Sequence, residues 1–435
     1  MKEITLDDKY TATGGRVYLS GAQALVRLPL MQRQRDLAMG LNTAGLISGY
    51  RGSPLGVYDL ALWQAGRFLR EHCVHFQPGV NEDLAATAVW GSQQLKEIGE
   101  SPYDGVFAMW YGKGPGVDRS GDPLKHGNYA GSARHGGVLV LCGDDHGARS
   151  STIAHQSDHA LIHFGMPILF PATIQEYLDL GLHGFALSRY AGCWVGFKCV
   201  TDVVEGSASV AVDREGVRIV QPADFQLPPG GLNLRLGVVP LAAEAQALLR
   251  LEAAKAYVRA HRLDRVIWPQ PRKRLGIVTA GKAWLDVMDA LAQLGIDEAR
   301  AEELGVSVYK VAMVWPLEPA GILRFAEGCE QLLVVEEKRP VIEEQVAALL
   351  YNQPSGWRPR LTGKRDLEGA PLVPASGELN PVLLARLIAR ELMRREPDAK
   401  LAARLVALEP PAAAGAPAGA PGPLFRGILR ASQTR

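Results

Sequence analysis

Between about residues 40 and 200, short apolar stretches alternate with longer stretches of helical periodicity. Five apolar stretches are strand candidates because each ends in glycine, proline or polar residues: "AGLISGY", "GVFAMWYG", "GGVLVLCGDD", "GMPILFP" and "CWVGFKCV". Strands that are apolar throughout and separated by helices predict an α/β fold with a parallel sheet covered on both faces. Ligands of such sheets bind beyond the carboxyl ends of the strands, so we look for functional residues in the loops that follow them.

The pattern divides the chain into four parts, of which the first, residues 1–205, contains this sheet. Residues 206–272 combine a segment rich in proline and glycine with one strong helical stretch, and they predict a connecting arm. Residues 273–400 repeat the strand–helix alternation and predict a smaller α/β domain. Residues 401–435 are rich in alanine, proline and glycine, which is typical of a linker or tail.

Charge and cysteine content exclude several functions. The 435 residues include 47 Lys+Arg and 46 Asp+Glu, so neither a nucleic acid nor a membrane surface is an expected partner. The five cysteines contain no CxxC pair, and this chain alone therefore builds no zinc ribbon or ferredoxin-type cluster. With no signal sequence and no apolar run of about 18 residues, we expect a cytoplasmic protein that does not cross a membrane.

The stretch "GVNEDLAATAVWGSQQ" predicts a helix that begins after Asn81, a suitable N-cap, with Glu82 at the positive end of the helix dipole. Leu84, Ala88 and Leu95 are expected to form its core-facing stripe. The alanines in this helix provide little bulk, which is typical of a helix that another backbone or a flat ligand approaches closely. Glu82 either stabilises only the helix start or serves such a ligand.

Two loops contain glycines and cations after predicted strands. "SGYRGSPLG" could bind a carboxylate or phosphate through free amides and Arg51, or it could be an ordinary strand-to-helix turn. "YGKGPGVDRSGDPLKHGN" is not a phosphate-binding loop of the P-loop type, because its Lys113 precedes the glycine-rich part. It is either functional or a surface loop in which Arg119 pairs with Asp118 or Asp122.

A third loop, "LCGDDHGARSSTIAHQSDH", contains acids and histidines, but of its histidines only His155 and His159 have helical metal-ligand spacing. It also departs from the Gly-Asp-Gly motif of magnesium-diphosphate sites, since Asp145 replaces the second glycine. No asparagine lies between residues 167 and 177, where the motif needs a ligand. We therefore predict neither a metal site nor a diphosphate site on this chain.

These motifs, together with "GIVTAGKAW", resemble the amino-terminal part of indolepyruvate ferredoxin oxidoreductase, a member of the thiamine-diphosphate-dependent 2-oxoacid:ferredoxin oxidoreductases. Five motifs occur in the same order, and the resemblance covers residues 5–400. It implies that the first domain is the pyrimidine-binding domain of the thiamine-diphosphate-enzyme fold. It also implies that residues 273–400 resemble the transketolase C-terminal domain.

The resemblance also implies site residues. Glu82 matches the glutamate that hydrogen-bonds N1′ of the aminopyrimidine ring, which makes it both catalytic and cofactor-binding. The small residues 85, 86 and 88 would let the helix and the ring approach. The remaining implied residues are Gly52, Ser53 and Pro54 for the cofactor, and Arg51, Ser53 and Arg119 for the substrate.

The implied reaction is the oxidative decarboxylation of indolepyruvate or another aryl pyruvate to an acyl-CoA, with coenzyme A as acceptor and ferredoxin taking the electrons. This chain would bind only the pyrimidine end of thiamine diphosphate. Mg²⁺ and an iron-sulfur cluster are expected on a separate diphosphate-binding domain or subunit, in a homo- or hetero-oligomer. Two alternatives stay open: part of a non-oxidative thiamine-dependent decarboxylase or transferase, and a truncated, non-catalytic remnant that only docks.

Overall fold

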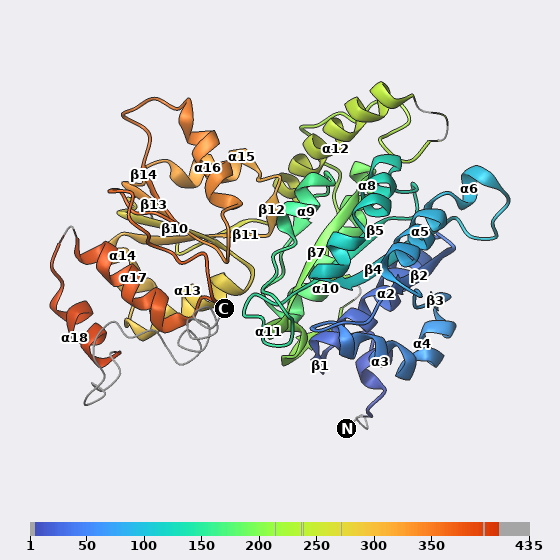
Figure 1. Cartoon of the computed structure of the whole chain (residues 1–435), viewed down its shortest axis with the longest axis horizontal. Helices are drawn as coiled ribbons and strands as arrows, with labels where there is room; N and C mark the ends of the chain where they lie inside the picture. Colours follow the sequence, from blue (N-terminus) through green and yellow to red (C-terminus); the bar gives the residue numbers. More distant parts are fainter. Residues whose placement is uncertain are drawn as a thin grey trace, which may run out of the picture.

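The computed structural model describes residues 5–408 apart from positions 214, 236, 238, 271 and 395. Two α/β units lie side by side, each with its own sheet and flanking helices (Figure 1). The first sheet has seven strands in the order β12-β6-β7-β5-β4-β2-β3, and the second has five in the order β14-β13-β10-β11-β9. The α/β fold expected from the apolar strand pattern is confirmed.

In the first sheet, the five strands predicted from the sequence are all present and parallel to one another. Their bounds are β2 Thr43–Gly49, β4 Gly105–Lys113, β5 Val138–Asp144, β6 Ile168–Leu169 and β7 Trp194–Val200. A short strand that the pattern did not reveal, β3 (Val74–Phe76), pairs in parallel with β2 at one edge. Separately, β1 (Arg16–Ser20) and β8 (Ser207–Ala211) form a two-stranded antiparallel ribbon.

Helices cover both faces of the first sheet (Figure 1). On one face, α2 (Gly21–Ala38) packs against α10 (Ile174–Ala191), and on the other α5 (Glu82–Gln93) packs against α8 (Gly121–Ala130). The start of α2 is fixed by a capping box, in which Ser20 and Gln23 each bond the other's backbone amide. The sheet is thus buried on both faces, which explains why its central strands are apolar throughout.

The segment 206–272, expected as a connecting arm, contains the expected long helix, α12 (Pro240–His261), but strands lie near both of its ends. β8 pairs with β1, and β9 (Arg265–Ile267) is part of the second sheet. The buried Arg250 of α12 donates hydrogen bonds to the carbonyls of Asn128 and Tyr129, both 2.9 Å away, near the end of α8. A further bond from its Nε reaches the carbonyl of Leu232 at 3.0 Å. Arg250 therefore fastens the arm to the first unit.

The second unit has its own core around a sheet of β9 (Arg265–Ile267), β10 (Leu275–Ala280), β11 (Val306–Val311), β13 (Gln331–Val335) and β14 (Arg360–Thr362). Its helices are α13 (Gly281–Gln293), α14 (Glu298–Leu304), α15 (Pro319–Ala326), α16 (Ile342–Tyr351), α17 (Pro381–Met393) and α18 (Ala399–Ala407). Leu401 on α18 is buried in this core, so the packed structure extends past residue 400. The rest of the tail expected at 401–435 lies outside the described residues.

The stretch "VSVYKVAMVWPL" was expected to be one strand, but it contributes to both sheets. After β11, the chain leaves the second sheet and forms β12 (Met313–Trp315), which pairs with β6 in an antiparallel direction. The carbonyl of Ala312, between the two strands, accepts a hydrogen bond of 2.9 Å from the amide of Phe170. A segment that follows the second unit's strand therefore completes the edge of the first sheet.

A buried ion pair also joins the two units. Glu176 on α10 binds the ammonium of Lys310 on β11, and both residues are less than a tenth exposed. The half-exposed Arg265 on β9 donates to the same carboxylate at 2.8 Å. Burial lowers the pKa of Lys310, and the carboxylate of Glu176 opposes that shift.

Replacing Glu176 tests this junction. Glu176→Gln should lower the free energy of unfolding by about 3 kcal/mol, because it leaves Lys310 buried without its counter-charge. Urea denaturation followed by circular dichroism measures the effect. The matched control is Glu252→Gln, which removes an exposed carboxylate paired with Lys255 and should cost less than about 0.5 kcal/mol. Equal small losses for both variants would contradict a structural role for the buried pair.

Candidate functional site at the carboxyl ends of the first sheet

The first sheet has a topological switch point between β2 and β4. After β2, the chain continues to β3 on one side, and it then returns to β4 on the other side of β2. The ladders pair Gly49 with Tyr111 and Lys113 with Gly143, so the loops after β2, β4 and β5 emerge at the same edge. Ligands of open α/β sheets bind in the crevice between such diverging loops. Every residue implied by the resemblance lies in these loops or at the start of α5.

Glu82 is the first residue of α5 and is only 7% exposed. Asn81 caps the helix by accepting the amide of Leu84 at 2.9 Å, and Trp110 Nε1 donates to the Glu82 carbonyl at 3.1 Å. Within the part of the chain that the structure describes, its carboxylate has neither a hydrogen bond nor an ion pair. Neither of its oxygens is among the fully buried atoms that lack a partner, so the carboxylate keeps some accessible surface and is available to a ligand.

The backbone of α7 (Gly114–Arg119) lies directly against the Glu82 side chain. A methyl group added at Gly116 would lie 2.8 Å from Glu82 Cγ and 2.9 Å from Oε1. Glycine at this position therefore leaves the room that the carboxylate occupies.

The exposed face of α5 differs from the expected one. Leu84, Ala88 and Leu95, predicted as the core-facing stripe, are all exposed, and the alanines at 85 and 86 are fully buried. These alanines face the sheet and let α5 pack closely on β2 and β4. The stripe prediction was wrong because the face that packs on the sheet is the one with Ala85, Ala86 and Val89, and because Leu95 lies in the next helix, α6 (Leu95–Ile98). The small residues at 85 and 86 therefore make room for the backbone of the protein's own sheet.

In the loop after β2, Ser53 Oγ lies 2.5 Å from Ser150 Oγ, and the Ser150 amide donates to Asp145 at 2.9 Å. Pro54 is buried, and Gly52 lies against the stem of Lys113, where an added methyl would approach Cδ to 2.8 Å. Arg51 is exposed, with no hydrogen bond or ion pair to any residue between 5 and 408 that the structure describes. The loop is thus held by Ser53 and Pro54, and Arg51 is available to a ligand.

Arg119 pairs with neither Asp118 nor Asp122, the partners considered for a surface loop. Its Nε lies 3.1 Å from Asp83 Oδ2, and both side chains are at least one-third exposed. This ion pair joins the end of α7 to the first turn of α5, beside Glu82. Asp118 instead lies 3.2 Å from Nε2 of His155, across the crevice.

Lys113, the last residue of β4, was noticed in the sequence only as a failed phosphate-loop lysine. Its side chain is partly buried along Gly52, and its ammonium group contacts no acceptor among the described residues. The sequence signal that could have identified Lys113 is a lysine at the end of a buried strand, just before a glycine-rich turn. The structure thus places a second unpaired cation, besides Arg51, at the switch point.

The acids and histidines after β5 form a structural network. Asp144 accepts Ser157 Oγ at 2.6 Å and lies 3.4 Å from Nζ of Lys198, which also pairs with Asp158. Burial alone would lower the pKa of Lys198, but Asp158 and Asp144 hold it above its ordinary value. His155 precedes α9 (Asp158–His163), so the helical pair with His159 does not form. Among the described residues, no group of three potential ligands is placed to hold a metal ion.

With this geometry in place, comparisons with known proteins show what the chain is similar to. A sequence model of the indolepyruvate oxidoreductase domain matches residues 265–414. Indolepyruvate oxidoreductase subunit IorA of Methanothermobacter marburgensis is 28% identical over 359 residues, 80% of this chain and 51% of that protein. The IorA subunit of Pyrococcus abyssi is 28% identical over 365 residues, 81% of this chain and 49% of that protein. The similarity to IorA subunits therefore extends over about four-fifths of this chain, in agreement with the resemblance seen in its motifs.

A solved structure supports the fold of this chain. The 2-oxoglutarate:ferredoxin oxidoreductase from Magnetococcus marinus, determined with 2-oxoglutarate, coenzyme A and succinyl-CoA bound, aligns with a TM-score of 0.59. At 14% identity, the alignment covers 87% of this chain and 65% of that one. The chain spans about half the length of the curated IorA proteins that it matches. None of its described helices is long and apolar enough to cross a bilayer.

The pH dependence of stability should reveal one buried histidine of this protein. Burial, and next the charge of Lys198, lower the pKa of His146 to about 4, and its Nδ1 lies 3.0 Å from the His155 carbonyl. Below pH 6.5, the unfolded chain binds a proton at this position that the folded chain does not bind. Stability from His146 is therefore complete above pH 6.5 and decreases as the pH falls toward 4.

Because of this shift, the free energy of unfolding of the wild type should fall between pH 7 and pH 5 by about 2 kcal/mol more than that of His146→Gln. Urea denaturation at the two pH values measures that difference. The control is His75→Gln, which replaces an exposed histidine and should keep the wild-type pH dependence. The assignment to His146 fails if its variant and the control show the same pH dependence.

Proposed function

We propose that this chain is the pyrimidine-side part of a thiamine-diphosphate-dependent 2-oxoacid:ferredoxin oxidoreductase acting on indolepyruvate or another aryl pyruvate. The observation that carries the proposal is the unpaired, buried carboxylate of Glu82 at the switch point. The similarity to known proteins supports it, because the matched relatives are indolepyruvate oxidoreductase subunits.

The residues at the switch point fit the pyrimidine end of thiamine diphosphate. Bound thiamine diphosphate supplies a thiazolium carbon that becomes a nucleophile toward the 2-oxoacid carbonyl when its proton leaves. Glu82 would hold a proton at ring nitrogen N1′, and Gly116 leaves room for the carboxylate to take that position. The loop 52–54 would lie beside the ring, since Gly52 packs on Lys113 at the same edge.

The unpaired cations fit a 2-oxoacid substrate. Arg51 could bind the carboxylate with two parallel hydrogen bonds, and Lys113 could bind it as a point charge. Arg119 is already paired with Asp83, so it would contribute by holding the first turn of α5 or by exchanging partners when substrate binds. We place Arg51 and Lys113 first for the substrate carboxylate for this reason.

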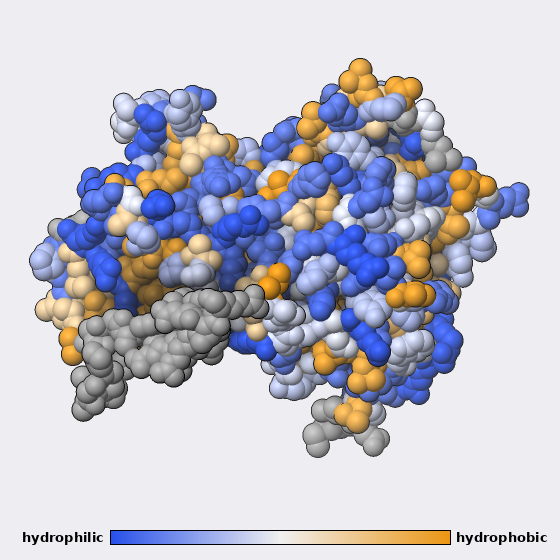
Figure 2. Space-filling model, viewed as in Figure 1, coloured by the Kyte–Doolittle hydropathy of each residue, from blue (hydrophilic) through white to orange (hydrophobic). Residues whose placement is uncertain are grey.

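The surface around the site fits a second protein part. Large apolar side chains are exposed there: Tyr50, Val57, Leu60, Val80 and Leu84, each at least 40% accessible. Figure 2 shows apolar surface among polar side chains near α3 (Gly56–Gln64). Contiguous apolar surface of this kind marks protein interfaces. A partner that covers it would also exclude water from Glu82.

That partner would be the diphosphate-binding domain or subunit, which makes the enzyme a homo- or hetero-oligomer. It would contain the Mg²⁺, the diphosphate site and the iron-sulfur cluster, and the assembled enzyme would use coenzyme A and pass electrons to ferredoxin. Only about half of each matched IorA protein aligns with this chain, and the other half is long enough to form such a further domain. A non-oxidative thiamine enzyme or a docking-only chain are the alternatives.

Glu82→Gln tests the catalytic role. The substitution keeps the shape of the side chain but removes its negative charge, so proton exchange at thiazolium C2 should slow by about 10²-fold or more. The measurement is hydrogen–deuterium exchange at C2 of thiamine diphosphate bound to the assembled enzyme, with wild type as reference. Glu82→Asp should also be slower, because the shorter side chain moves the carboxylate out of hydrogen-bond range.

Thermal unfolding of the same variants separates this role from helix stabilisation. A carboxylate that serves only the helix dipole contributes about 0.3–1 kcal/mol. Unchanged C2 exchange in Glu82→Gln, with only a small fall in melting temperature, would remove Glu82 from the mechanism and favour the docking-only alternative.

Gly116→Ala tests the geometry without touching the carboxylate. The added methyl should displace the Glu82 side chain, which is flexible, so C2 exchange should fall by about tenfold or more. The control is Gly91→Ala on the same helix as Glu82, where an added methyl meets no atom within 4 Å. Gly91→Ala should leave the rate of C2 exchange unchanged. Wild-type exchange in Gly116→Ala would contradict the proposed contact between α7 and Glu82.

A further inference from the structure

A large pocket lies at the amino ends of the strands of the first sheet, whereas Glu82 lies at their carboxyl ends. Its volume is about 840 Å³, within the usual range for small-molecule sites. It is lined by the end of α2, the loop before β5, the end of α10 and arm residues between 215 and 233. Because β5 spans seven residues, the two ends are about 20 Å apart. The pocket is thus separate from the site at the strands' carboxyl ends.

The lining of this pocket is predominantly basic. Arg189 is already used, since it binds both oxygens of Asp36 at 2.7 and 2.8 Å and the Gly136 carbonyl. Arg134 and Arg218 have no hydrogen bond or ion pair to any described residue. Glu215 is the one carboxylate among the described lining residues. These charges favour an anionic ligand.

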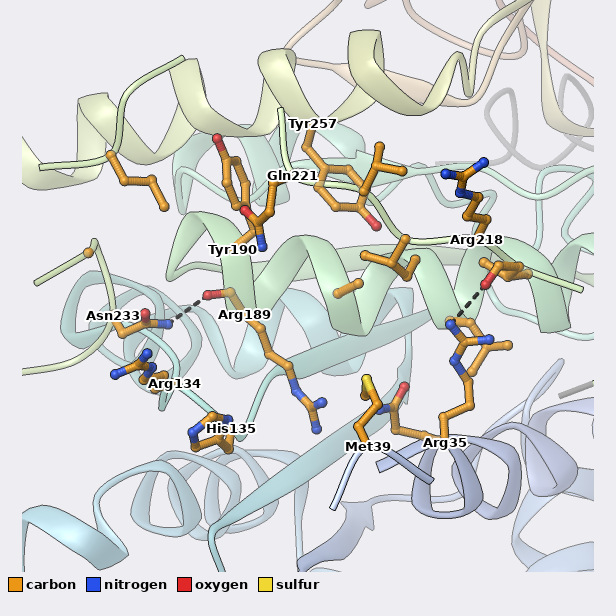
Figure 3. Close-up of a pocket in the computed structure, with 18 of the residues that line it drawn as sticks. Arg35, Met39, Arg134, His135, Arg189, Tyr190, Arg218, Gln221, Asn233 and Tyr257 are labelled. Carbon is orange, nitrogen blue, oxygen red and sulfur yellow. Dashed lines mark hydrogen bonds between the residues drawn. The ribbon is translucent and has the colours of Figure 1, made fainter. Parts of the chain in front are cut away.

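The two available arginines lie at different ends of the pocket, Arg134 beside His135 and Arg218 across from them (Figure 3). At the first end, burial and then the charges of Arg189 and Arg134 lower the pKa of His135. Two arginines therefore lie close to His135 at this end, and the lowered pKa leaves its ring free to donate or accept a hydrogen bond as a neutral imidazole. The carboxylate of Glu215 also lines the pocket. The Arg134 end is the stronger anion site.

Between the two ends, the pocket is apolar and offers hydrogen bonds. Leu182 and Ala186 on α10 line it together with the rings of Tyr190 and Tyr257, and Gln221 points into the same space (Figure 3). The Tyr190 hydroxyl is buried and has no hydrogen-bond partner among the described residues. Aromatic rings with nearby amide and hydroxyl groups suit a flat heterocycle with polar edges.

We propose that this pocket binds a nucleoside phosphate, with the phosphate at Arg134 and His135 and the base beside Tyr190 and Gln221. The combination carries the inference: an unpaired arginine beside a histidine at one end, an aromatic middle, an unpartnered hydroxyl, and a volume that accommodates a nucleotide. The site is distinct from the one proposed for thiamine diphosphate and does not depend on it. Binding there would tie the arm to α2 and α10.

Isothermal titration of the full chain with ADP tests the proposal. ADP should bind saturably and raise the melting temperature, whereas adenosine and pyrophosphate, each lacking one half of the ligand, should bind at least tenfold more weakly. Arg134→Gln should weaken ADP binding by about tenfold or more, because it removes a charge-assisted hydrogen bond. Arg218→Gln, the matched arginine at the other end, should change it by less than about threefold.

Three outcomes would overturn the proposal. They are no saturable ADP binding, equal affinity for pyrophosphate and ADP, or wild-type affinity in Arg134→Gln. Glu82→Gln should leave ADP binding unchanged. Loss of ADP binding in this variant would instead place the nucleotide at the carboxyl ends of the strands. Thermal unfolding of each variant without ligand shows whether the variants are folded. The result is independent of C2 exchange, so either proposal can fail alone.

Discussion

The hydrogen-bonded ladders of β2, β4 and β5 are the constraint on which the rest of the site depends. Parallel pairing aligns these strands so that Gly49, Lys113 and Asp144 all end at one edge. The order of the strands then sends the loops after β2 and β4 in different directions and leaves a crevice between them. Glu82, Arg51 and Lys113 meet there although they are far apart in sequence, because each follows or lies beside one of these strand ends.

The polar groups at this edge divide into two classes. Asp144, Lys198 and Asp158 are buried and satisfy one another, which fixes the loop after β5. Glu82, Arg51 and Lys113 have no partners within the described structure. A buried, satisfied network that fixes one loop, beside charged groups that lack partners, is typical of a scaffold that holds groups ready for a ligand.

The second unit is attached by more than its linker. β12 completes the edge of the first sheet, and the pair of Glu176 and Lys310 is buried between the units. An arm helix adds Arg250, whose hydrogen bonds end on the carbonyls of the first unit. These contacts fix one unit on the other, so a partner would meet a single rigid surface rather than two independent domains.

The sequence by itself determined the main strands, the long helices and the parallel arrangement, because buried parallel strands are apolar along their whole length and helices repeat every 3.6 residues. The motifs also showed the resemblance to indolepyruvate oxidoreductases, which the comparisons support, and pointed to Glu82. Short pieces such as β3 and β12 were not predicted, since two or three residues contain too little periodicity to recognise. A break between β11 and β12 has no local signal, as both halves are apolar.

Only the tertiary structure decided which charges are paired. Arg119 binds Asp83 from another helix, Ser53 contacts Ser150, and Lys113 stays unpaired, and none of these facts follows from sequence spacing. The same is true of α5, whose exposed face depends on where the sheet lies. Side-chain pairing and burial depend on neighbours that folding brings from distant parts of the chain, whereas strands and helices depend mainly on residues nearby.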